Sequence, residues 1–386
     1  MIRVLFFNYE YPPLGGGAAN ATAYLLREFS KKHNLKIDLI TSSIDGDNHI
    51  EKIGNNIKIY RLPIGKNKNR LHFQTQKELV VYSWKAYFFA RKLVRKNKYD
   101  LTHSFFAVPC GFISHLLWRE KKLPYIISLR GSDVPGYSER FSLIYKILIP
   151  LIRVIWKYAE FVVANSLEFK KLAQKVNPNQ KIKVITNGID VKEFYCRNLL
   201  NEGNAEDSFR VICGSRITPR KGIRFIIKAT QILKSKGIKI ELDIIGEGNE
   251  KRDLEKMVDN MNLNKEINFL GVIKHSELPK YYQRSNVYVS ASFNEGMSNT
   301  MLEALACGLP IIATKTGGTN EMVFSGENGF VVEMKSAEDI AKKIEIIFNN
   351  FELEKKMSEK SRQIAEKMSW ENIANDYEAL YKKIKQ

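Results

Sequence analysis

The sequence has little cysteine, and nothing in its arrangement suggests a covalently or metal-stabilised fold. Its 386 residues include four cysteines with no CxxC pair: Cys110, Cys196, Cys213 and Cys307. A disulfide framework or a zinc site is therefore not expected. The six histidines form no HxxxH pair, which argues against a dedicated metal centre. Asp45 and Asp47 form a DGD triplet, but two carboxylates in a polar turn are common, so we assign them no metal role.

Long hydrophobic runs are also missing. The apolar run that opens the chain in MIRVLFFNYE is too short for a signal peptide and is typical of a buried first strand. The most apolar later stretch, 141–165, is interrupted by Lys146, Arg153 and Lys157, so it is not a clean membrane span. We expect a cytoplasmic protein. Residues 139–158 are either a core helix with a basic edge or a peripheral contact with the inner face of an anionic membrane.

Acidic residues are scarce in the first half of the chain. Residues 1–195 hold 32 Lys and Arg against 15 Asp and Glu, a net charge of +17, and the remaining 29 against 27 give +2. This asymmetry favours an anionic partner for the first half: a lipid surface, a phosphorylated substrate or nucleic acid. A solvated, lysine-rich surface is the alternative. Because no nucleic-acid-binding module is recognisable and the second half is nearly neutral, we expect no nucleic-acid partner.

Strand-like and helix-like segments alternate along the chain, which indicates parallel βα units in more than one domain. The polar stretch 197–208 is interpreted as a linker, after which the alternation restarts. The pattern predicts an α/β protein with two doubly wound domains, whose ligands bind beyond the carboxyl ends of the strands. The expected strands are 2–8, 36–41, 57–62, 100–105, 124–129, 161–165, 209–215, 238–246, 267–271, 287–292 and 310–314; the expected helices include 19–32, 221–237 and a last helix from Trp370.

Two acidic residues stand eight positions apart in FNEGMSNTMLEALACGLPIIAT, residues 293–314. A helix is expected to begin near Ser298 or Asn299, so Glu295 precedes it and Glu303 lies about one turn inside. A helix N-terminus attracts phosphate, and carboxylates accept hydrogen bonds from sugar and ribose hydroxyls. The pattern therefore indicates a sugar-nucleotide site. The alternative is an ordinary loop residue followed by a solvated helix residue.

Basic residues and glycines mark other strand-to-helix turns. GSRITPRKG places Arg216 and Lys221 where a diphosphate would lie, although they are equally compatible with surface charge. IIGEG is a glycine turn after a strand, which by itself is weak evidence. In YEYPPLGGGAAN, the glycines 15–17 join the first strand to the first helix and favour backbone contact with a phosphate. Neither GxGxxG nor a P-loop is present, so readings as an NAD-binding protein or an ATP hydrolase weaken.

Taken in order, GSRITPRKG, IIGEG, FLGVI and EGMSNTMLEALACGLPII resemble the glycosyltransferases of family 4, which have the GT-B fold. The resemblance covers nearly the whole chain. It implies two Rossmann-like domains facing across a cleft, a UDP- or GDP-linked sugar donor, retention of anomeric configuration, and no metal or other cofactor. It also implies an N-terminal acceptor-binding domain, 1–195, and a C-terminal nucleotide-sugar-binding domain, 196–369, with the helix 370–386 packing back on the first.

The resemblance also assigns roles to individual positions. It implies that Glu303 binds the nucleotide ribose, that Glu295 holds hydroxyls of the donor sugar, and that Arg216 and Lys221 bind the diphosphate. The remaining implied donor contacts are Gly16, Gly17, Gly246, Val272, Gly296, Met297, Ser298 and Asn299.

Two further candidate catalytic residues lie in the first half. Arg130 in SLRGSD stands where a histidine near the donor sugar is usual; it cannot act as a base, but it can bind a sugar oxygen or phosphate. A structural ion pair with Asp133 is the alternative. His103 matches a frequent family histidine, and a satisfied core histidine is equally compatible with its sequence.

The expected function is sugar transfer to a glycan or lipid-linked saccharide in cell-surface polysaccharide or glycolipid synthesis. The basic first half and the apolar, basic segment 139–158 suggest this acceptor class. A non-catalytic sugar-nucleotide-binding protein is the alternative, because Arg130 departs from the family pattern. A nucleic-acid-binding protein is a more distant one.

Overall fold

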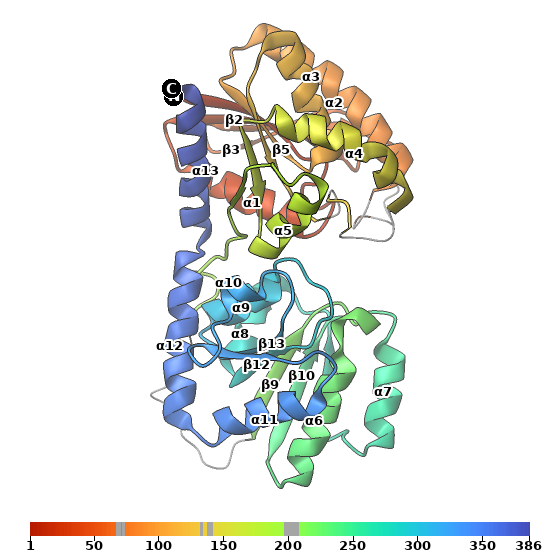
Figure 1. Ribbon diagram of the computed structural model, residues 1–386, viewed down its shortest axis with the longest axis vertical. Helices are drawn as coiled ribbons and strands as arrows, with labels where there is room; N and C mark the ends of the chain where they lie inside the picture. The colour runs from red at the N-terminus through yellow and green to blue at the C-terminus, as the bar shows by residue number, and fades with distance from the viewer. Residues whose placement is uncertain (67–70, 72–73, 132–133, 137–141, 197–207) are drawn as a thin grey trace. The chain divides into compact units, whose positions relative to one another are not determined.

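The computed structural model describes residues 1–386 except 67–70, 72–73, 132–133, 137–141 and 197–207, and it describes no side chains for 142–146 (Figure 1). It divides into one unit of Met1–Gly188 with Trp370–Gln386 and a second unit of Ile189–Ser369. Residues 189–195, which we expected in the first domain, belong to the second unit, where Phe194 is fully buried. The expected linker lies outside the described residues except for Ser208.

The first unit is built on an eight-stranded sheet in the order β3-β4-β2-β1-β5-β6-β7-β8, parallel except for the antiparallel pair β3–β4. Its central strands are almost entirely buried, as expected of strands covered on both faces. The edge strand β3 was not predicted, because HIEKI is short and half polar. The strands are β1 Ile2–Phe7, β2 Leu35–Ser43, β3 His49–Ile53, β4 Ile57–Pro63, β5 Leu101–Phe105, β6 Tyr125–Ser128, β7 Phe161–Ala164 and β8 Ile182–Val184.

Helices cover this sheet. Helix α2 begins with a capping box, in which Thr75 and Glu78 satisfy each other's backbone N–H groups. It lies beside α3 (Figure 1), to which it is linked by a 2.9 Å ion pair between Arg91 and Glu120. The helical segments are α1 Gly17–Ser30, α2 Gln76–Lys96, η1 Ala107–Gly111, α3 Phe112–Lys121, α4 Ser142–Lys157, α5 Leu167–Val176 and, from the end of the chain, α13 Trp370–Lys385.

The C-terminal helix α13 completes the core of the first unit. Trp370 stacks on Tyr24 of α1 with ring centroids 5.5 Å apart. Further along α13, the Tyr381 hydroxyl forms a 2.7 Å hydrogen bond with Nδ1 of His103 on β5, and both residues are fully buried. The last helix therefore contributes apolar burial and a buried hydrogen-bond partner to a sheet formed early in the sequence.

The second unit has a six-stranded, fully parallel sheet in the order β11-β10-β9-β12-β13-β14, the Rossmann arrangement. The doubly wound α/β fold class predicted for both halves is thus confirmed. Strand β14 was missed because GFVV is very short. The elements are β9 Phe209–Gly214, η4 Pro219–Lys221, α6 Ile223–Ser235, β10 Ile240–Ile245, α7 Lys251–Asn260, β11 Ile267–Gly271, η5 His275–Glu277, α8 Leu278–Gln283, β12 Val287–Ser290, α9 Asn299–Ala306, β13 Ile311–Thr314, α10 Thr319–Met322, β14 Gly329–Val332, α11 Ala337–Phe348 and α12 Phe351–Lys367.

We predict that Tyr381→Phe destabilises the chain by about 1–3 kcal/mol, because it leaves a buried ring nitrogen of His103 without its partner. Urea unfolding followed by circular dichroism measures the change. Tyr195→Phe makes the same chemical change at a residue that is 57% exposed, so its effect should stay within about 0.5 kcal/mol. Equal effects of the two substitutions would contradict the role of the Tyr381 hydroxyl as the buried hydrogen-bond partner of His103.

Candidate active site

The candidate site of the second unit lies where the winding of its sheet reverses. Strand β9 has β10 on one side and β12 on the other, so the loops that follow β9 and β12 leave the same edge side by side. The backbone N–H of Phe293 donates to the carbonyl of Arg220 over 2.9 Å, which joins the two loops directly. The two motifs that the sequence separates by about seventy residues are thus neighbours.

Close backbone contacts explain the glycines at this edge. Gly222 has φ of +64°, and a Cβ there would lie 2.2 Å from the carbonyl oxygen of Ala291. Gly246, at the end of β10, has φ of +130°, and its Cβ would lie 1.9 Å from the carbonyl oxygen of Ser215. Only glycine allows both the conformation and the approach. These glycines hold the turns after β9, β10 and β12 against one another.

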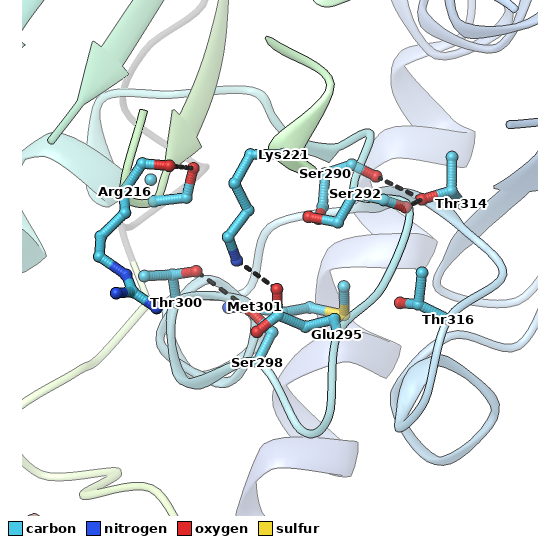
Figure 2. A network of polar contacts seen from close by, with 12 residues as sticks. Arg216, Lys221, Ser290, Ser292, Glu295, Ser298, Thr300, Met301, Thr314 and Thr316 are labelled. Atoms are coloured by element: carbon cyan, nitrogen blue, oxygen red, sulfur yellow. Dashed lines mark hydrogen bonds and ion pairs between the residues drawn. The ribbon is translucent and has the colours of Figure 1, made fainter. Parts of the chain in front are cut away.

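An ion pair between Lys221 and Glu295 lies at the junction of the two loops (Figure 2). Only 12% of the Lys221 side chain and 21% of the Glu295 side chain are exposed, so the pair is partly shielded from water. Arg216, from the same loop as Lys221, is exposed and forms no ion pair with any residue that the structure describes. The structure therefore brings two of the predicted catalytic residues into contact and leaves a third at the surface nearby.

Helix α9 begins at Asn299, as predicted, and its first turn lies beside this ion pair. The Ser298 hydroxyl caps it by accepting a 3.4 Å hydrogen bond from the Met301 N–H, and it also lies 3.1 Å from the Thr300 hydroxyl. Figure 2 shows Ser298 and Thr300 close to the Lys221–Glu295 pair. The first turn of a helix directs backbone N–H groups and a partial positive charge outward. A cation and a helix N-terminus thus share one small region.

Glu303 lies one turn inside α9 and is buried rather than solvated. The Tyr282 hydroxyl of α8 donates to its Oε2 over 2.9 Å, and Nε2 of His275 lies 3.6 Å from its Oε1. The other ring nitrogen of His275, Nδ1, lies 2.9 Å from Oε1 of Glu193. Glu303, with help from Glu193, raises the pKa of His275 to about 9 against the opposing effect of partial burial. An imidazolium therefore bridges two carboxylates.

Sequence reasoning missed His275, Tyr282 and Glu193. None of them forms a short-range motif with Glu303; they come from the turn η5, from helix α8 and from the segment that enters the second unit. The only available signal was that an acidic residue on the buried side of a helix needs hydrogen-bond donors. That rule requires partners but does not say where in the sequence they lie.

The other predicted donor contacts of this unit fall into two groups. Gly296, Met297 and Asn299 lead into α9, and Met297 is 7% exposed. Val272 is 77% exposed and follows β11, whose last residue, Gly271, accepts a 2.8 Å hydrogen bond from the Gly246 N–H. The two turns that carry Gly246 and Val272 are thus adjacent.

In the first unit, His103 is a satisfied core histidine. It is fully buried, its Nδ1 is bonded to Tyr381, and its Nε2 lies 2.8 Å from the Ser128 hydroxyl. Burial first, and then the charge of Arg130, hold its pKa well below the usual value, so the ring is neutral. This geometry corresponds to the core alternative, because both ring nitrogens are bonded within the core. A catalytic role of His103 stays a prediction.

Arg130 is positioned by several contacts in the first unit. Its guanidinium carbon lies 3.7 Å above the centroid of the Phe105 ring, and its NH groups donate to Asn187 Oδ1 over 2.9 Å and to the Tyr377 hydroxyl over 3.1 Å. The alternative partner, Asp133, lies outside the described residues. Arg130 is a fixed, partly exposed cation beyond the end of β6.

The glycine loop after β1 contains one residue that the sequence did not single out. Burial raises the pKa of Glu10 to about 7, although a hydrogen bond from the Gly16 N–H and the charge of Lys66 both act to lower it. The Glu10 side chain packs under Gly15, and Gly16 has open space where a Cβ would stand. The loop leads directly into α1, which begins at Gly17.

No group of three or more His, Cys, Asp or Glu side chains is placed to hold a metal ion within the described part of the chain. Among the helices described, none is long and apolar enough to cross a membrane.

Comparison with known families decides which family the chain belongs to. Residues 15–193 match the model described as Glycosyltransferase Family 4, and residues 197–364 match the one described as Glycosyl transferases group 1. The chain belongs to glycosyltransferase family 4. An uncharacterized glycosyltransferase of Methanocaldococcus jannaschii is 27% identical over 100% of this chain and 99% of its own.

Solved structures of other proteins have the same fold. Sucrose-phosphate synthase from Thermosynechococcus elongatus superimposes with a TM-score of 0.82 at 22% identity, covering 100% of this glycosyltransferase and 99% of that chain. Anabaena HepE in complex with UDP and glucose gives a TM-score of 0.73 at 18% identity, covering 99% and 100%. The predicted GT-B class, with two Rossmann-like units, is confirmed.

We predict a pH-dependent contribution of His275 to the stability of this glycosyltransferase. Its pKa is about 9 in the folded chain, against about 6.5 for an unperturbed histidine. A raised folded-state pKa adds stability that is full below the unfolded pKa and is lost as the pH rises through the folded one. The difference in unfolding free energy between wild type and His275→Gln should therefore be largest near about pH 6 and smallest near about pH 10.

Urea unfolding across this pH range measures the difference. Tyr282→Phe is the matched control, because it removes the other Glu303 donor and the pKa of Tyr282 lies well above 10. Its cost should stay nearly constant with pH. A His275→Gln cost that is equally constant would show that His275 is not the titrating partner of Glu303.

Proposed function

We propose that this chain is a retaining glycosyltransferase that moves a sugar from a UDP- or GDP-linked donor to a glycan or lipid-linked saccharide, without a metal. The observation that carries the proposal is the Lys221–Glu295 pair at the start of α9. A cation and a helix N-terminus suit a diphosphate, and the neighbouring carboxylate suits sugar hydroxyls. The complex of HepE with UDP and glucose supports a donor of this class.

Each candidate donor-site residue of the second unit has a proposed role. Glu303 accepts hydrogen bonds from the ribose hydroxyls, with His275 and Tyr282 fixing its position. Lys221 and Arg216 contact the diphosphate, and Lys221 gives up part of its pairing with Glu295 when the ligand binds. The backbone from Gly296 to Asn299, with the turns at Gly246 and Val272, completes the donor contacts. In the first unit, the loop with Gly16 and Gly17 contacts phosphate.

The proposed reaction is a front-face displacement at the anomeric carbon. The bond from that carbon to the diphosphate oxygen breaks while the acceptor oxygen bonds to the same face. The acceptor proton passes to the departing phosphate oxygen. Lys221 and Arg216 stabilise the negative charge that develops on the diphosphate, a role that needs no metal ion. Arg130 is proposed to hydrogen-bond a donor sugar oxygen or a phosphate.

The acceptor class is proposed from charge. The first 195 residues carry a net charge of +17, which favours an anionic acceptor or one presented at an anionic surface. We therefore propose a cytoplasmic enzyme, peripheral at the inner membrane face, that acts in cell-surface polysaccharide or glycolipid synthesis. The alternative is a non-catalytic sugar-nucleotide-binding protein, which the two experiments below separate from an enzyme.

We predict that UDP or GDP raises the thermal unfolding midpoint and that Glu303→Ala abolishes the rise. A ligand at about a hundred times its Kd adds roughly 2.7 kcal/mol to the stability of the state it binds. ADP is tested as a third nucleotide beside UDP and GDP. Because Glu303→Ala itself removes buried hydrogen bonds, the quantity to compare is the shift on adding nucleotide, not the midpoint.

Glu359→Ala is the control, since Glu359 is exposed on α12 and should keep the full shift. A nucleotide shift that survives Glu303→Ala would remove the proposed ribose contact. No shift with any nucleotide would count against the donor site as a whole.

We predict that transfer from the identified donor yields a product with the anomeric configuration of the donor sugar, at a rate that EDTA does not change. Nuclear magnetic resonance of the product gives the configuration. Glu295→Gln should lower the transfer rate by about a hundredfold or more, because it removes a charged hydrogen-bond acceptor from the reacting sugar. Asn294→Ala, at the exposed neighbouring position, should have little effect.

An inverted product, or loss of activity in EDTA, would contradict the proposed mechanism. Nucleotide binding without transfer to any acceptor tested would favour the non-catalytic alternative.

A further inference from the structure

The outer face of α2 carries an unusual set of side chains. Its three exposed apolar residues are Val80, Trp84 and Phe88, which are 68%, 66% and 48% exposed. They are spaced by four residues, so they lie on one face over consecutive turns. The Trp84 and Phe88 rings contact each other edge to face, with centroids 5.2 Å apart. Large apolar side chains that gather at the surface usually mark a contact.

The same face is basic at both ends and carries no acid. The exposed residues of α2 are Gln76, Lys77, Val80, Trp84, Phe88, Lys92, Arg95 and Lys96. The acidic residue of this helix, Glu78, is buried in the capping box and pairs with Lys66. Lys77 precedes the apolar residues by three positions, and Lys92 and Arg95 follow them by four and seven. We call Lys77, Val80, Trp84, Phe88, Lys92 and Arg95 the α2 stripe.

The α2 stripe is backed by well-packed structure. On the opposite side of the helix, Tyr82, Ala86 and Ala90 are fully buried in the core of the first unit. Helix α3 lies beside α2 (Figure 1), and the Arg91–Glu120 ion pair joins the two helices. The exposed side chains therefore project from a rigid element, and their exposure is not a result of fraying.

The composition of the stripe fits one kind of partner. An anionic lipid surface takes aromatic and aliphatic side chains into its interface while Lys and Arg reach the headgroup phosphates. A protein partner fits less well, because protein interfaces are depleted in lysine. Nucleic acid fits less well, because the centre of the stripe offers three adjacent apolar side chains and no charge to a phosphate backbone.

We propose that the α2 stripe is a membrane-docking surface for anionic lipid. Val80, Trp84 and Phe88 enter the interface, and Lys77, Lys92 and Arg95 bind headgroup phosphates. This inference deepens the proposed function, because it specifies how the enzyme reaches a membrane-borne acceptor. It assigns docking to 76–96. A membrane contact of the segment 139–158, of which 139–141 lie outside the described residues, stays a prediction.

The test is sedimentation of the full chain with vesicles of phosphatidylcholine alone or mixed with phosphatidylglycerol, at low and high salt. We expect at least about tenfold stronger partitioning to the anionic vesicles, weakened by salt, because each basic residue near the surface adds to the attraction. Trp84 reports its own insertion through a blue shift of fluorescence. Trp156 and Trp370 are buried, and Trp118 is half-buried against Tyr158, so Trp84→Phe should remove most of the shift.

Two variants address the two halves of the mechanism. The apolar variant, Val80→Ser with Trp84→Ser and Phe88→Ser, should lose partitioning and the fluorescence shift. The charge variant, Lys77→Glu with Lys92→Glu and Arg95→Glu, should lose at least about tenfold in binding to anionic vesicles.

The control for charge is Lys228→Glu with Arg252→Glu and Lys256→Glu, three exposed residues of the second unit. The control for apolar exposure is Phe351→Ser, at a residue that is 55% exposed.

Each outcome supports or overturns the proposal. Loss of vesicle binding in both stripe variants, with both controls unchanged and unfolding midpoints intact, supports it. Wild-type protein that binds no vesicle, or stripe variants that bind as well as wild type, overturns it. A wild-type dimer that both stripe variants dissociate would assign the stripe to a second copy. Loss of salt-dependent RNA or DNA binding would assign it to nucleic acid.

The nucleotide shift measured on the same proteins separates this inference from the proposed function. Stripe variants that no longer bind vesicles should keep the full UDP or GDP shift. If no nucleotide shifts wild type while vesicle binding follows the stripe, the proposed function fails and the docking surface remains.

Discussion

The candidate donor site depends on one constraint, which is the reversal of winding between β9 and β12. Chains that leave adjacent parallel strands toward opposite faces open a gap at the carboxyl ends. In this protein the gap is bordered by two loops joined by the Phe293–Arg220 hydrogen bond and by the close approach of Gly222 to Ala291. Lys221 and Glu295 meet because of that approach. The α9 N-terminus has its place for the same reason, since α9 follows the second loop.

The two carboxylates of the candidate site in the second unit have different partners and different exposure. Glu295 is partly exposed and pairs with a lysine at the loop junction. Glu303 is buried and is held by a tyrosine hydroxyl and an imidazolium. In the proposed function, the first pair exchanges partners when the diphosphate binds, because the pair is partly exposed. The Glu303 carboxylate is held by its two partners before any ligand binds. Such a prearranged hydrogen-bond acceptor suits the selection of a hydroxyl-bearing group.

The first unit places its polar groups differently. The C-terminal helix brings Tyr377 and Tyr381 to the sheet, where they satisfy Ser128, His103 and Arg130. A helix from the end of the chain therefore positions Arg130, a residue of the first half of the chain. The outer side of the same unit carries the α2 stripe, whose exposure contrasts with the closed interior behind it. Burial, and not residue type alone, separates structural from interactive groups in this unit.

The sequence by itself determined the two doubly wound units, most of their strands, and the start of α9 near Ser298 or Asn299. Strand and helix periodicity, glycines at turns and a capping serine are local signals, and local physics sets them. Only the tertiary structure decided that His103 is a core residue, that Lys221 pairs with Glu295, and that His275, Tyr282 and Glu193 surround Glu303. Those relations join residues far apart in the chain, and no spacing rule carries them. Tertiary packing also decided which face of α2 stays in water, because an apolar residue at helical spacing is buried or exposed according to what packs against it.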